Sequence, residues 1–489
     1  MKIEKIVKPC RNFCFLGSEL ITDPRDGKEK FVLSTFAGEG GSLVFIDTET
    51  GEGESISLPA DSGAWALYNY NNERLLVGTC ASYGYLHCLE LKTRTWLKSL
   101  RCEGETYIWN LTMGSDGNIY GGTYPGCVLL RYDPRRHELV NLGKADNGKN
   151  LYSRYVFGDC GGKILVNCVF AESGVNCWDI DKEEFSKVFG DGETILRIKN
   201  NTIYTQRNNE KYFYDAGTFE PVDMPEEDEK PNPLLPGESG HIKALGDGRI
   251  IGIKGQEYFI IDHGTISYKR IPVSPPATEI FTVTGDGKGK IWGSSGFGQT
   301  IFSYDPDNGE AWNSLTVTDI GGEVYGMRFI DGLLYLSAYS GGDHVVYDPS
   351  KEWNQRGNVN PKTLESVSPK LIRPNGGSAV GPDGAFWTGW MAGYGAYGGG
   401  ISRIDPATHE MTCWHDPVEG QAISSIEADE RYIYFVTCGE ANGLPYKEGR
   451  FSLCVWNGSR EEIKRITFGE GKRPSLWLQL RIAHLCALP

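Results

Sequence analysis

Short apolar runs recur along the chain, and each is bounded by Gly, Asp, Asn or Pro. Within many runs apolar and polar residues alternate, and the apolar members are mostly β-branched or aromatic, as in LVFIDTE, TIFSYDP and HVVYDP. This alternation is typical of strands with one buried face. No run with the period and length of a helix separates them. The pattern predicts an all-β protein.

The runs belong to a repeated unit, whose clearest copies are DGNIYGGTYPGCVLLRYDP (116–134), KGKIWGSSGFGQTIFSYDP (288–306) and DGLLYLSAYSGGDHVVYDP (331–349). An acidic residue or its equivalent ends the second run of each copy and marks the repeat. The marks are Asp47, Glu90, Asp133, Asp179, Asp215, Asp262, Asp305, Asp348, Asp405 and Asn457. Successive marks lie 36 to 57 residues apart, which is the length of a small supersecondary unit.

Each copy is long enough to form four strands. In the third copy we read strands in TYIWNLTMG, IYGGTY, VLLRYDP and RRHELVNLG, with SDGN and PGC as connecting turns. A four-stranded antiparallel sheet repeated in series is the blade of a β-propeller. We expect the repeated Asp residues to make the turn after the third strand, because Pro fixes φ and Asp bonds to the backbone beyond it.

We expect the β-propeller to occupy residues 1–471, followed by an atypical tail at 472–489 that abandons the glycine and turn residues. Ten units exceed the usual four to eight blades. Three arrangements stay open: one large ring, a seven- or eight-bladed ring with excursions near 193–274, or a complete first ring over 10–317 with further blades at 318–471.

Composition and charge exclude some partners. The 489 residues carry a formal charge of −15 without a basic stripe, which disfavours nucleic acid and anionic membranes. The N-terminus lacks a secretory signal, so we expect a cytoplasmic location, and no window is apolar enough for a membrane helix. The 13 cysteines are scattered without a CxxC pair. We therefore expect structural thiols, with no metal and no cofactor.

The loops between the second and third strands are rich in glycine and aromatic residues, and so are the starts of the first strands. In a propeller these segments emerge on one face around the central channel. Aromatic rings there offer flat surfaces with a polar edge to a ligand, although hairpin turns and packing between blades also use such residues. The candidate substrate-binding residues are Trp65, Trp109, Tyr124, Phe297, Tyr339, Trp390, Tyr394 and Tyr397.

Polar residues at the same positions suggest proton transfer beside a uronic acid carboxylate. The candidate bases are His241 and His344, the candidate acids are Tyr152 and Tyr325, and Arg154 is the candidate clamp for the carboxylate. A His or Arg at a strand end is also common as a solvated loop residue.

The segments DGNIYGGTYPG, GPDGAFWTGW (381–390) and GGGISRIDP (398–406) resemble those of bacterial β-propellers of the YVTN, NHL, quinoprotein-like and streptogramin-lyase-like kind. The resemblance covers residues 10–470 and implies the blade, without specifying an activity. Relatives of this shape include polysaccharide lyases, glycosidases, metal-dependent lactonases and binding proteins. None of their catalytic motifs can be matched residue by residue.

Three functions follow as expectations. The first is a propeller that binds, and as an enzyme cleaves, a uronide-type carbohydrate; a small molecule or glycan is then its partner. The second is a non-catalytic scaffold for a protein partner. The third is a metal-dependent, lactonase-like hydrolase, for which the first strands offer few carboxylates beyond Glu279 and Asp159.

Overall fold

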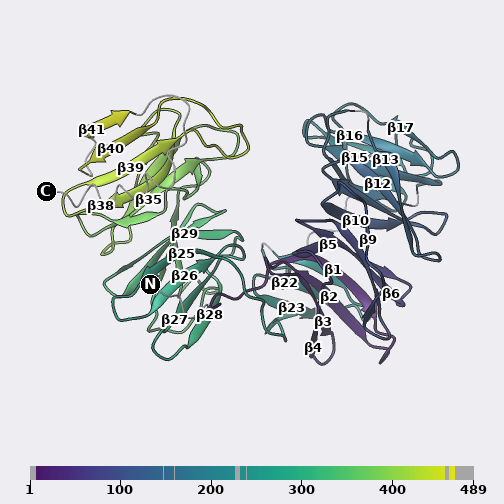
Figure 1. Ribbon diagram of the computed structural model, residues 1–489, viewed down its shortest axis with the longest axis horizontal. Helices are drawn as coiled ribbons and strands as arrows, with labels where there is room; N and C mark the ends of the chain where they lie inside the picture. Colours follow the sequence, from purple (N-terminus) through teal and green to yellow (C-terminus); the bar gives the residue numbers. More distant parts are fainter. Residues whose placement is uncertain are drawn as a thin grey trace. The chain divides into compact units, whose positions relative to one another are not determined.

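The computed structural model describes residues 7–146, 148–158, 160–225, 232–237, 239–457 and 462–467 (Figure 1). These residues form 41 β-strands and no helix, which confirms the all-β prediction. A membrane-spanning helix is accordingly absent from the described part of the chain. The predicted tail at 472–489 lies outside the described residues.

The strands form ten groups in chain order. The first three groups are β1 (Phe15–Thr22), β2 (Glu29–Thr35), β3 (Ser42–Asp47) and β4 (Gly53–Ser57); β5 (Gly63–Tyr70), β6 (Arg74–Cys80), β7 (Tyr85–Glu90), β8 (Thr95–Trp96) and β9 (Leu100–Arg101); and β10 (Tyr107–Met113), β11 (Ile119–Tyr124), β12 (Val128–Asp133) and β13 (Glu138–Lys144). The next three are β14 (Tyr152–Phe157), β15 (Lys163–Val169), β16 (Gly174–Asp179) and β17 (Glu184–Val188); β18 (Thr194–Lys199), β19 (Thr202–Arg207) and β20 (Glu210–Asp215); and β21 (Gly240–Ala244), β22 (Ile250–Lys254), β23 (Glu257–Asp262) and β24 (Thr265–Arg270).

The last four groups follow the same plan. They are β25 (Ile280–Gly285), β26 (Ile291–Ser295), β27 (Thr300–Tyr304) and β28 (Ala311–Thr316); β29 (Glu323–Ile330), β30 (Leu333–Tyr339), β31 (Asp343–Tyr347) and β32 (Lys362–Ser366); β33 (Leu371–Arg373), β34 (Ser378–Val380), β35 (Phe386–Ala392), β36 (Gly399–Ile404) and β37 (Met411–His415); and β38 (Ala422–Ala428), β39 (Ile433–Cys438), β40 (Ser452–Trp456) and β41 (Glu462–Thr467).

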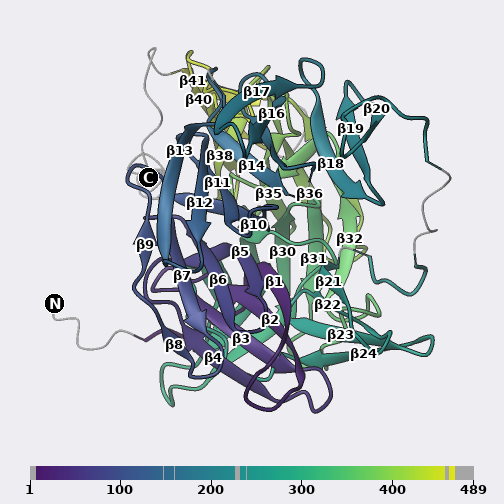
Figure 2. The same cartoon turned by 90° about the vertical axis from the view of Figure 1, so that its right-hand side faces the viewer.

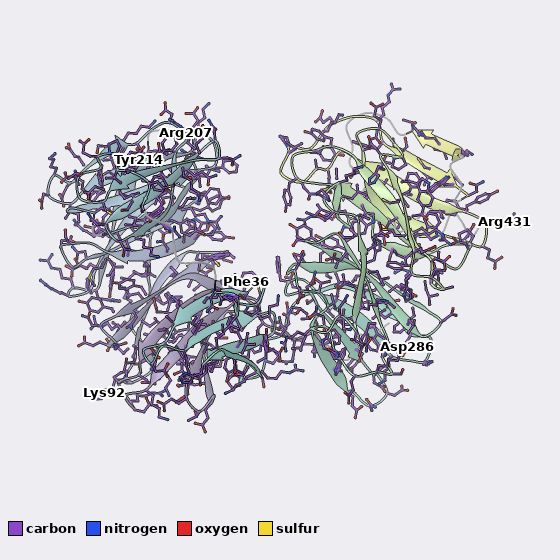
Figure 3. All side chains as sticks on the ribbon, turned by 180° about the vertical axis from the view of Figure 1, so that it is seen from behind. Phe36, Lys92, Arg207, Tyr214, Asp286 and Arg431 are labelled. Carbon is purple, nitrogen blue, oxygen red and sulfur yellow. The ribbon has the colours of Figure 1, made fainter. Side chains whose placement is uncertain are left out.

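Within each group the strands pair antiparallel and mostly in sequence order, except that β7 pairs with both β8 and β9, and β35 pairs with both β33 and β34. The second and third groups join into one nine-stranded sheet. In the third group the register follows the turns: Met113 faces Ile119 across SDGN, and Asp133 faces Glu138 across the Asp-Pro turn. Figure 2 shows β10 to β13 side by side. The fifth group has three strands, and Arg207 and Tyr214 mark it in Figure 3. The reading of the third repeat copy as four antiparallel strands is confirmed.

The repeated acidic residue has the turn role that the sequence predicted. Nine of the ten marks lie at the end of the third strand of their group or directly after it, and Asp405 directly follows β36, the fourth of the five strands in the ninth group. Asp47 Oδ1 accepts hydrogen bonds from the amides of Glu49 and Thr50, at 2.9 and 2.8 Å. Asp405 makes the same pair of bonds with Ala407 and Thr408. The carboxylate thus satisfies backbone donors that the end of a strand leaves unpaired.

The apolar cores lie between neighbouring groups, because the central strands bury both faces. In β2 six of the seven residues are buried, including Phe31 and Leu33. The core around these two residues also contains Ile251 and Tyr258 of the sixth group. The sixth group therefore packs on the first, although about 200 residues separate them in sequence.

Contacts divide the chain into two compact units. The first unit comprises residues 13–253 and 258–274, which hold the first six groups, and the second comprises the described residues among 1–12, 254–257 and 275–489. The division lies near 274, whereas one of the three arrangements that the sequence left open placed a first ring over 10–317. The number of rings, their blades and ring closure stay predictions.

Candidate functional site

The first strand of each group carries a β-bulge, and predicted site residues lie on several of these bulges. The pairing register shifts between Ala64 and Ala66 in β5, between Ile108 and Leu111 in β10, and between Ser153 and Val156 in β14. A bulge leaves one residue out of the ladder and changes the direction of its side chain. The residues in these three bulges include Trp65, Trp109 and Arg154. Bulges in β21, β25 and β29 hold His241, Phe281 and Tyr325 in the same way.

Six aromatic side chains of the first unit form a continuous series, which we call the aromatic row. Its members are Trp65, Tyr107, Trp109, Tyr124, Tyr152 and Phe170. Trp65 lies 5.7 Å from Trp109, and Tyr107 stacks on Trp109 at 4.9 Å. Tyr124 stacks on Tyr152 at 4.6 Å. The first strands β5, β10 and β14 are neighbours, so three successive groups contribute to one row.

The ends of the aromatic row are accessible to solvent. Trp65 is 37% exposed and Phe170 is 69% exposed, whereas the stacked members between them are partly buried. Burial raises the pKa of Tyr107, so its hydroxyl stays protonated at neutral pH and can donate a hydrogen bond. The row therefore presents two exposed rings with hydroxyl groups between them.

Arg154 lies on the aromatic row. Its guanidinium carbon is 4.8 Å from the centre of the Trp109 ring and 5.4 Å from that of Tyr155. Among the described residues the guanidinium has no carboxylate partner, and its buried Nε has no hydrogen-bond acceptor. The buried Nε1 of Trp109 also lacks an acceptor there. A cation and a donor without acceptors, side by side, can both donate hydrogen bonds to an anion.

A second cluster lies in the second unit and consists of Arg373 with Tyr325, Tyr339 and Tyr394; we call it the tyrosine–arginine cluster. Arg373 donates from Nη1 to the Tyr325 hydroxyl at 2.7 Å, and its guanidinium carbon lies 3.9 Å from the centre of the Tyr339 ring. The hydroxyls of Tyr339 and Tyr394 are hydrogen-bonded to each other. Burial and this bond raise the pKa of Tyr339 to about 12, so the Tyr339 hydroxyl is protonated at neutral pH.

Glu323 adds a buried carboxyl beside this cluster. It faces Tyr339 across the β29–β30 ladder, and its Oε2 has no hydrogen-bond partner among the described residues. Burial raises the pKa of Glu323, and the charge of Arg373 opposes that rise. A cavity of about 290 Å³ adjoins Arg373 and is lined by Asn375, Glu440 and Asn442 among others. An ionic substrate group could reach Arg373 from this cavity.

Two predicted site residues are wrong, because the structure buries them completely. His344 is 0% exposed, and its Nδ1 and Nε2 are bonded to the carbonyl of Glu365 and the hydroxyl of Ser402. Burial lowers the pKa of His344 to about 4. Trp390 is also 0% exposed and donates from Nε1 to Ser402 at 2.7 Å. Both side chains fill the core between the eighth and ninth groups, where no dissolved ligand reaches them.

The other predicted residues lie outside the two clusters. His241 contacts the carbonyl of Phe15, with Nε2 at 3.4 Å, and burial lowers its pKa. Phe297 is exposed in the loop after β26. Tyr397 donates to the carbonyl of Pro445, and the Lys447 ammonium lies over its ring. Their roles in a site stay predictions.

Sequence reasoning missed Arg373, Tyr107 and Phe170. Arg373 ends the short strand β33, which is not one of the repeat positions from which the candidates were chosen. Tyr107 lies two residues before the candidate Trp109, and both lie near the start of β10. Phe170 opens the loop FAESG, which has the same repeat position as the loop of Tyr124. An alignment of the repeat copies with one another could have identified Tyr107 and Phe170 as candidates.

The described residues contain one group of three side chains suited to a metal ion, Cys127, Asp146 and Cys168, and it belongs to neither cluster. Asp159, a predicted metal candidate, lies outside the described residues.

No family model matches the chain, and no curated protein matches it either. Solved structures that resemble it include the extracellular domain of BT4673 from B. thetaiotaomicron, at 13% identity and a TM-score of 0.34, covering 93% of this chain and 71% of that one. Another is the extracellular domain of BT3049 from B. thetaiotaomicron, at 13% identity and a TM-score of 0.32, covering 93% and 65%. A third is virginiamycin B lyase from Staphylococcus aureus, at 13% identity and a TM-score of 0.27, covering 68% and 91%.

The comparisons contradict the cytoplasmic location that we expected from the N-terminus, because three of the similar structures are extracellular domains. At these identities a likeness concerns the fold and not the activity. The repeated four-stranded antiparallel groups make this chain a β-propeller, and its resemblance to streptogramin-lyase-like propellers is one of fold.

Proposed function

We propose that the aromatic row and Arg154 bind an acidic saccharide of the uronic type. The observation that carries this proposal is the charge of Arg154, which has no acceptor among the described residues in a protein of net charge −15. A half-buried charge without a partner is costly, and a ligand carboxylate would remove that cost. Arg suits this role because its planar fork binds carboxylates through two parallel hydrogen bonds.

The rings around Arg154 favour a saccharide over a simple anion. Sugars have apolar faces that lie on aromatic rings and hydroxyl edges that hydrogen-bond to polar groups. Trp65 and Phe170 offer exposed rings at the two ends of the row, and Tyr107 and Tyr152 bring hydroxyl groups to the middle. A scaffold that binds a protein partner on the same face is the alternative, and the test below separates the two.

Binding of oligogalacturonides to the full chain tests the proposal by isothermal titration calorimetry. We expect binding of the acidic oligomer and much weaker binding of its methyl ester, which keeps the sugar but lacks the charge. Arg154→Met should weaken binding of the acid by about 10- to 100-fold, the cost of a charge-assisted hydrogen bond.

The matched control is Arg131→Met, because Arg131 lies on the same unit but pairs with Glu183 at 3.0 Å. This variant should bind the acid as the parent does. Equal binding of acid and ester, or equal loss in both arginine variants, would reject the aromatic row as the site. Circular dichroism spectra confirm that each variant is folded.

A second function, cleavage of a uronide by β-elimination, is supported by the tyrosine–arginine cluster. In this reaction a base removes the proton beside the carboxylate, the C–O bond to the leaving sugar breaks, and a carbon–carbon double bond forms while the leaving oxygen takes a proton. Arg373 would bind the carboxylate of the substrate, and the unpaired carboxylate of Glu323 would act as the base. Protonated Tyr339, which is hydrogen-bonded to Tyr394, would supply the proton.

The ultraviolet absorbance of the unsaturated product tests cleavage directly. We expect product from the parent chain, with a loss of at least about 100-fold in Arg373→Met and Glu323→Gln. Tyr304→Phe in β27 is the control and should keep the rate. Absence of product from the parent would reject cleavage and leave the binding proposal standing, since the two clusters are independent.

A further inference from the structure

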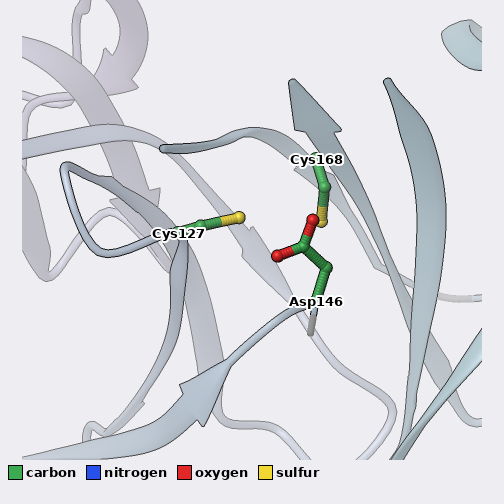
Figure 4. Close-up of side chains that lie close together, drawn as sticks. All are labelled: Cys127, Asp146 and Cys168. Atoms are coloured by element: carbon green, nitrogen blue, oxygen red, sulfur yellow. The ribbon is translucent and has the colours of Figure 1, made fainter. Parts of the chain in front are cut away.

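Three side chains from separate segments of the first unit converge on one point (Figure 4). Cys127 precedes β12, Asp146 follows β13, and Cys168 lies in β15 of the next group. Their sulfur and carboxylate oxygen atoms all lie within 4.8 Å of one another. None of the sequence spacings among them matches a zinc motif, so the fold alone brings them together.

The position of Cys127 is fixed by the backbone. Its amide donates to the carbonyl of Leu151 at 3.1 Å, and its carbonyl accepts from the amide of Ala145 at 2.7 Å. Its φ is 54°, in the left-handed region that glycine adopts at lower cost. The thiol is 0% exposed. The chain therefore holds a sulfur atom rigidly at a backbone position that favours glycine.

Neighbouring amides orient the other two groups. Asn150 donates from Nδ2 to Asp146 Oδ2 at 2.6 Å, which turns the carboxylate. Asn176 donates from Nδ2 to Cys168 Sγ at 3.7 Å and to the carbonyl of Ala145 at 2.7 Å. Partners of this kind orient metal ligands and strengthen their binding.

A cavity of about 850 Å³ opens beside the cluster. Asp146 and Cys168 both line it, together with Asn150 and Asn176. Cys127 is fully buried. An ion at this point would have a path from solvent, and a fourth coordination position would face the cavity.

We propose that Cys127, Asp146 and Cys168 bind a divalent transition-metal ion of the Zn²⁺ class, with its fourth position open to the cavity. Two sulfur ligands select borderline and soft ions over Mg²⁺ or Ca²⁺. Tetrahedral Zn²⁺, with bonds of about 2.0–2.3 Å, sets its ligand atoms about 3.4–3.8 Å apart, which the 4.8 Å limit accommodates. The proposal departs from the sequence analysis, which expected no metal, and it does not depend on saccharide binding.

Titration of the reduced, metal-free full chain with Co²⁺ tests the site, because thiolate ligands give Co²⁺ an intense charge-transfer band. We expect one equivalent to produce the band, and one equivalent of Zn²⁺ to remove it. Cys168→Ser should weaken Zn²⁺ binding by more than about 100-fold. Asn176→Ala should weaken it by about 10- to 100-fold, as the loss of an outer partner does.

Cys177→Ser is the matched control, since Cys177 is equally buried in the neighbouring strand β16 but lies outside the cluster. It should bind both ions as the parent does. Asp146→Asn lies at a partly exposed position and keeps the test valid if a cysteine variant fails to fold; it should weaken binding and retain the band. No band from the parent, an equal loss in Cys177→Ser, or a Cys127–Cys168 disulfide in protein purified with Zn²⁺ would overturn the proposal.

Discussion

Arg154 and Arg373 show how little of a charged side chain's role is visible in its sequence context. Arg154 follows Ser153 and precedes Tyr155 in the segment YSRYVF. It lies in the bulge of β14, and its guanidinium contacts aromatic rings. The strand pattern suggested that it reaches the ligand face, but not that it lacks a carboxylate partner. Arg373 reaches Tyr325 through a contact between residues 48 positions apart. Only the fold brings such groups together.

His344 illustrates the opposite error. The sequence placed it in a glycine-rich loop, whereas the structure places it in β31, where its ring is buried against Trp390. The strand begins at Asp343, so His344 lies within the strand and its side chain belongs to the core. Here all five residues of β31 are buried, and the loop between β30 and β31 comprises only residues 340–342.

The buried His344 makes stability depend on pH. Its pKa is about 4 in the folded state and about 6.5 when unfolded, so below pH 6.5 the unfolded chain binds the extra proton. This contribution to stability is complete above pH 6.5 and is lost as the pH falls to 4. We expect it to remove about 2 kcal/mol between pH 7 and pH 5.

Urea unfolding at both pH values measures this effect in the parent and in His344→Gln. The variant is less stable at pH 7, but its unfolding free energy should change with pH by about 2 kcal/mol less than that of the parent. An identical pH dependence in the two proteins would show that His344 does not titrate in this way.

At the scale of the strand, the β-bulge in the first strand of a group sets the direction of several candidate site side chains. Alternation of apolar and polar residues predicted the first strands correctly, but a bulge inserts one residue without changing composition. The sequence therefore predicted Trp65, Trp109 and Arg154 as candidates at the starts of first strands, but not the bulges in which they lie. The four-strand groups and the Asp turn were predictable because turn residues mark them locally.

The bulge in β14 can be tested at Tyr155, whose φ is 72° and whose side chain is 46% exposed. Tyr155→Gly should leave stability unchanged or raise it by up to about 1 kcal/mol, because glycine adopts this φ without strain. Tyr155→Val should lower stability by about 1–2 kcal/mol, because a β-branched residue tolerates it poorly. Thermal unfolding measures the stability of the two variants. Equal changes in stability would show that the backbone at Tyr155 is not strained.

The contribution of the repeated Asp side chain to stability should increase with its burial. Asp47 is 5% exposed and pairs with Lys30 at 2.6 Å, whereas Asp305 has the same repeat position nearer the surface. Asp47→Ala should cost about 2–3 kcal/mol, because Lys30 keeps only its contact with Asp26. Asp305→Ala should cost about 1 kcal/mol through its turn bonds. Urea unfolding of both variants measures the difference, and equal costs would contradict the role of the buried ion pair.

At the scale of the whole molecule, the repeat count was predictable and the division into units was not. Ten marks in the sequence, nine acidic residues and Asn457, correspond to ten strand groups. Which groups pack together depends on contacts such as those of Leu33 with the sixth group, and no local pattern encodes these. The repeated sequence specifies the fold of one blade. Which blades become neighbours depends on how well their apolar faces pack together.

Two units with separate cores should unfold separately. Leu33 belongs to a core of the first unit, and Leu336 to a core of the second. We expect two calorimetric transitions, with Leu33→Ala lowering one and Leu336→Ala lowering the other, each at a cost of about 2–5 kcal/mol. A single transition that both variants lower equally would contradict this independence.

The central claim is that a propeller scaffold holds an acidic saccharide on the aromatic row. A crystal structure of the full chain with a trigalacturonate at saturating concentration tests it most directly. We predict sugar rings over Trp65 or Phe170 and a carboxylate within hydrogen-bond distance of Arg154. Saccharide bound elsewhere on the chain, with Arg154 still lacking an acceptor, would contradict the claim.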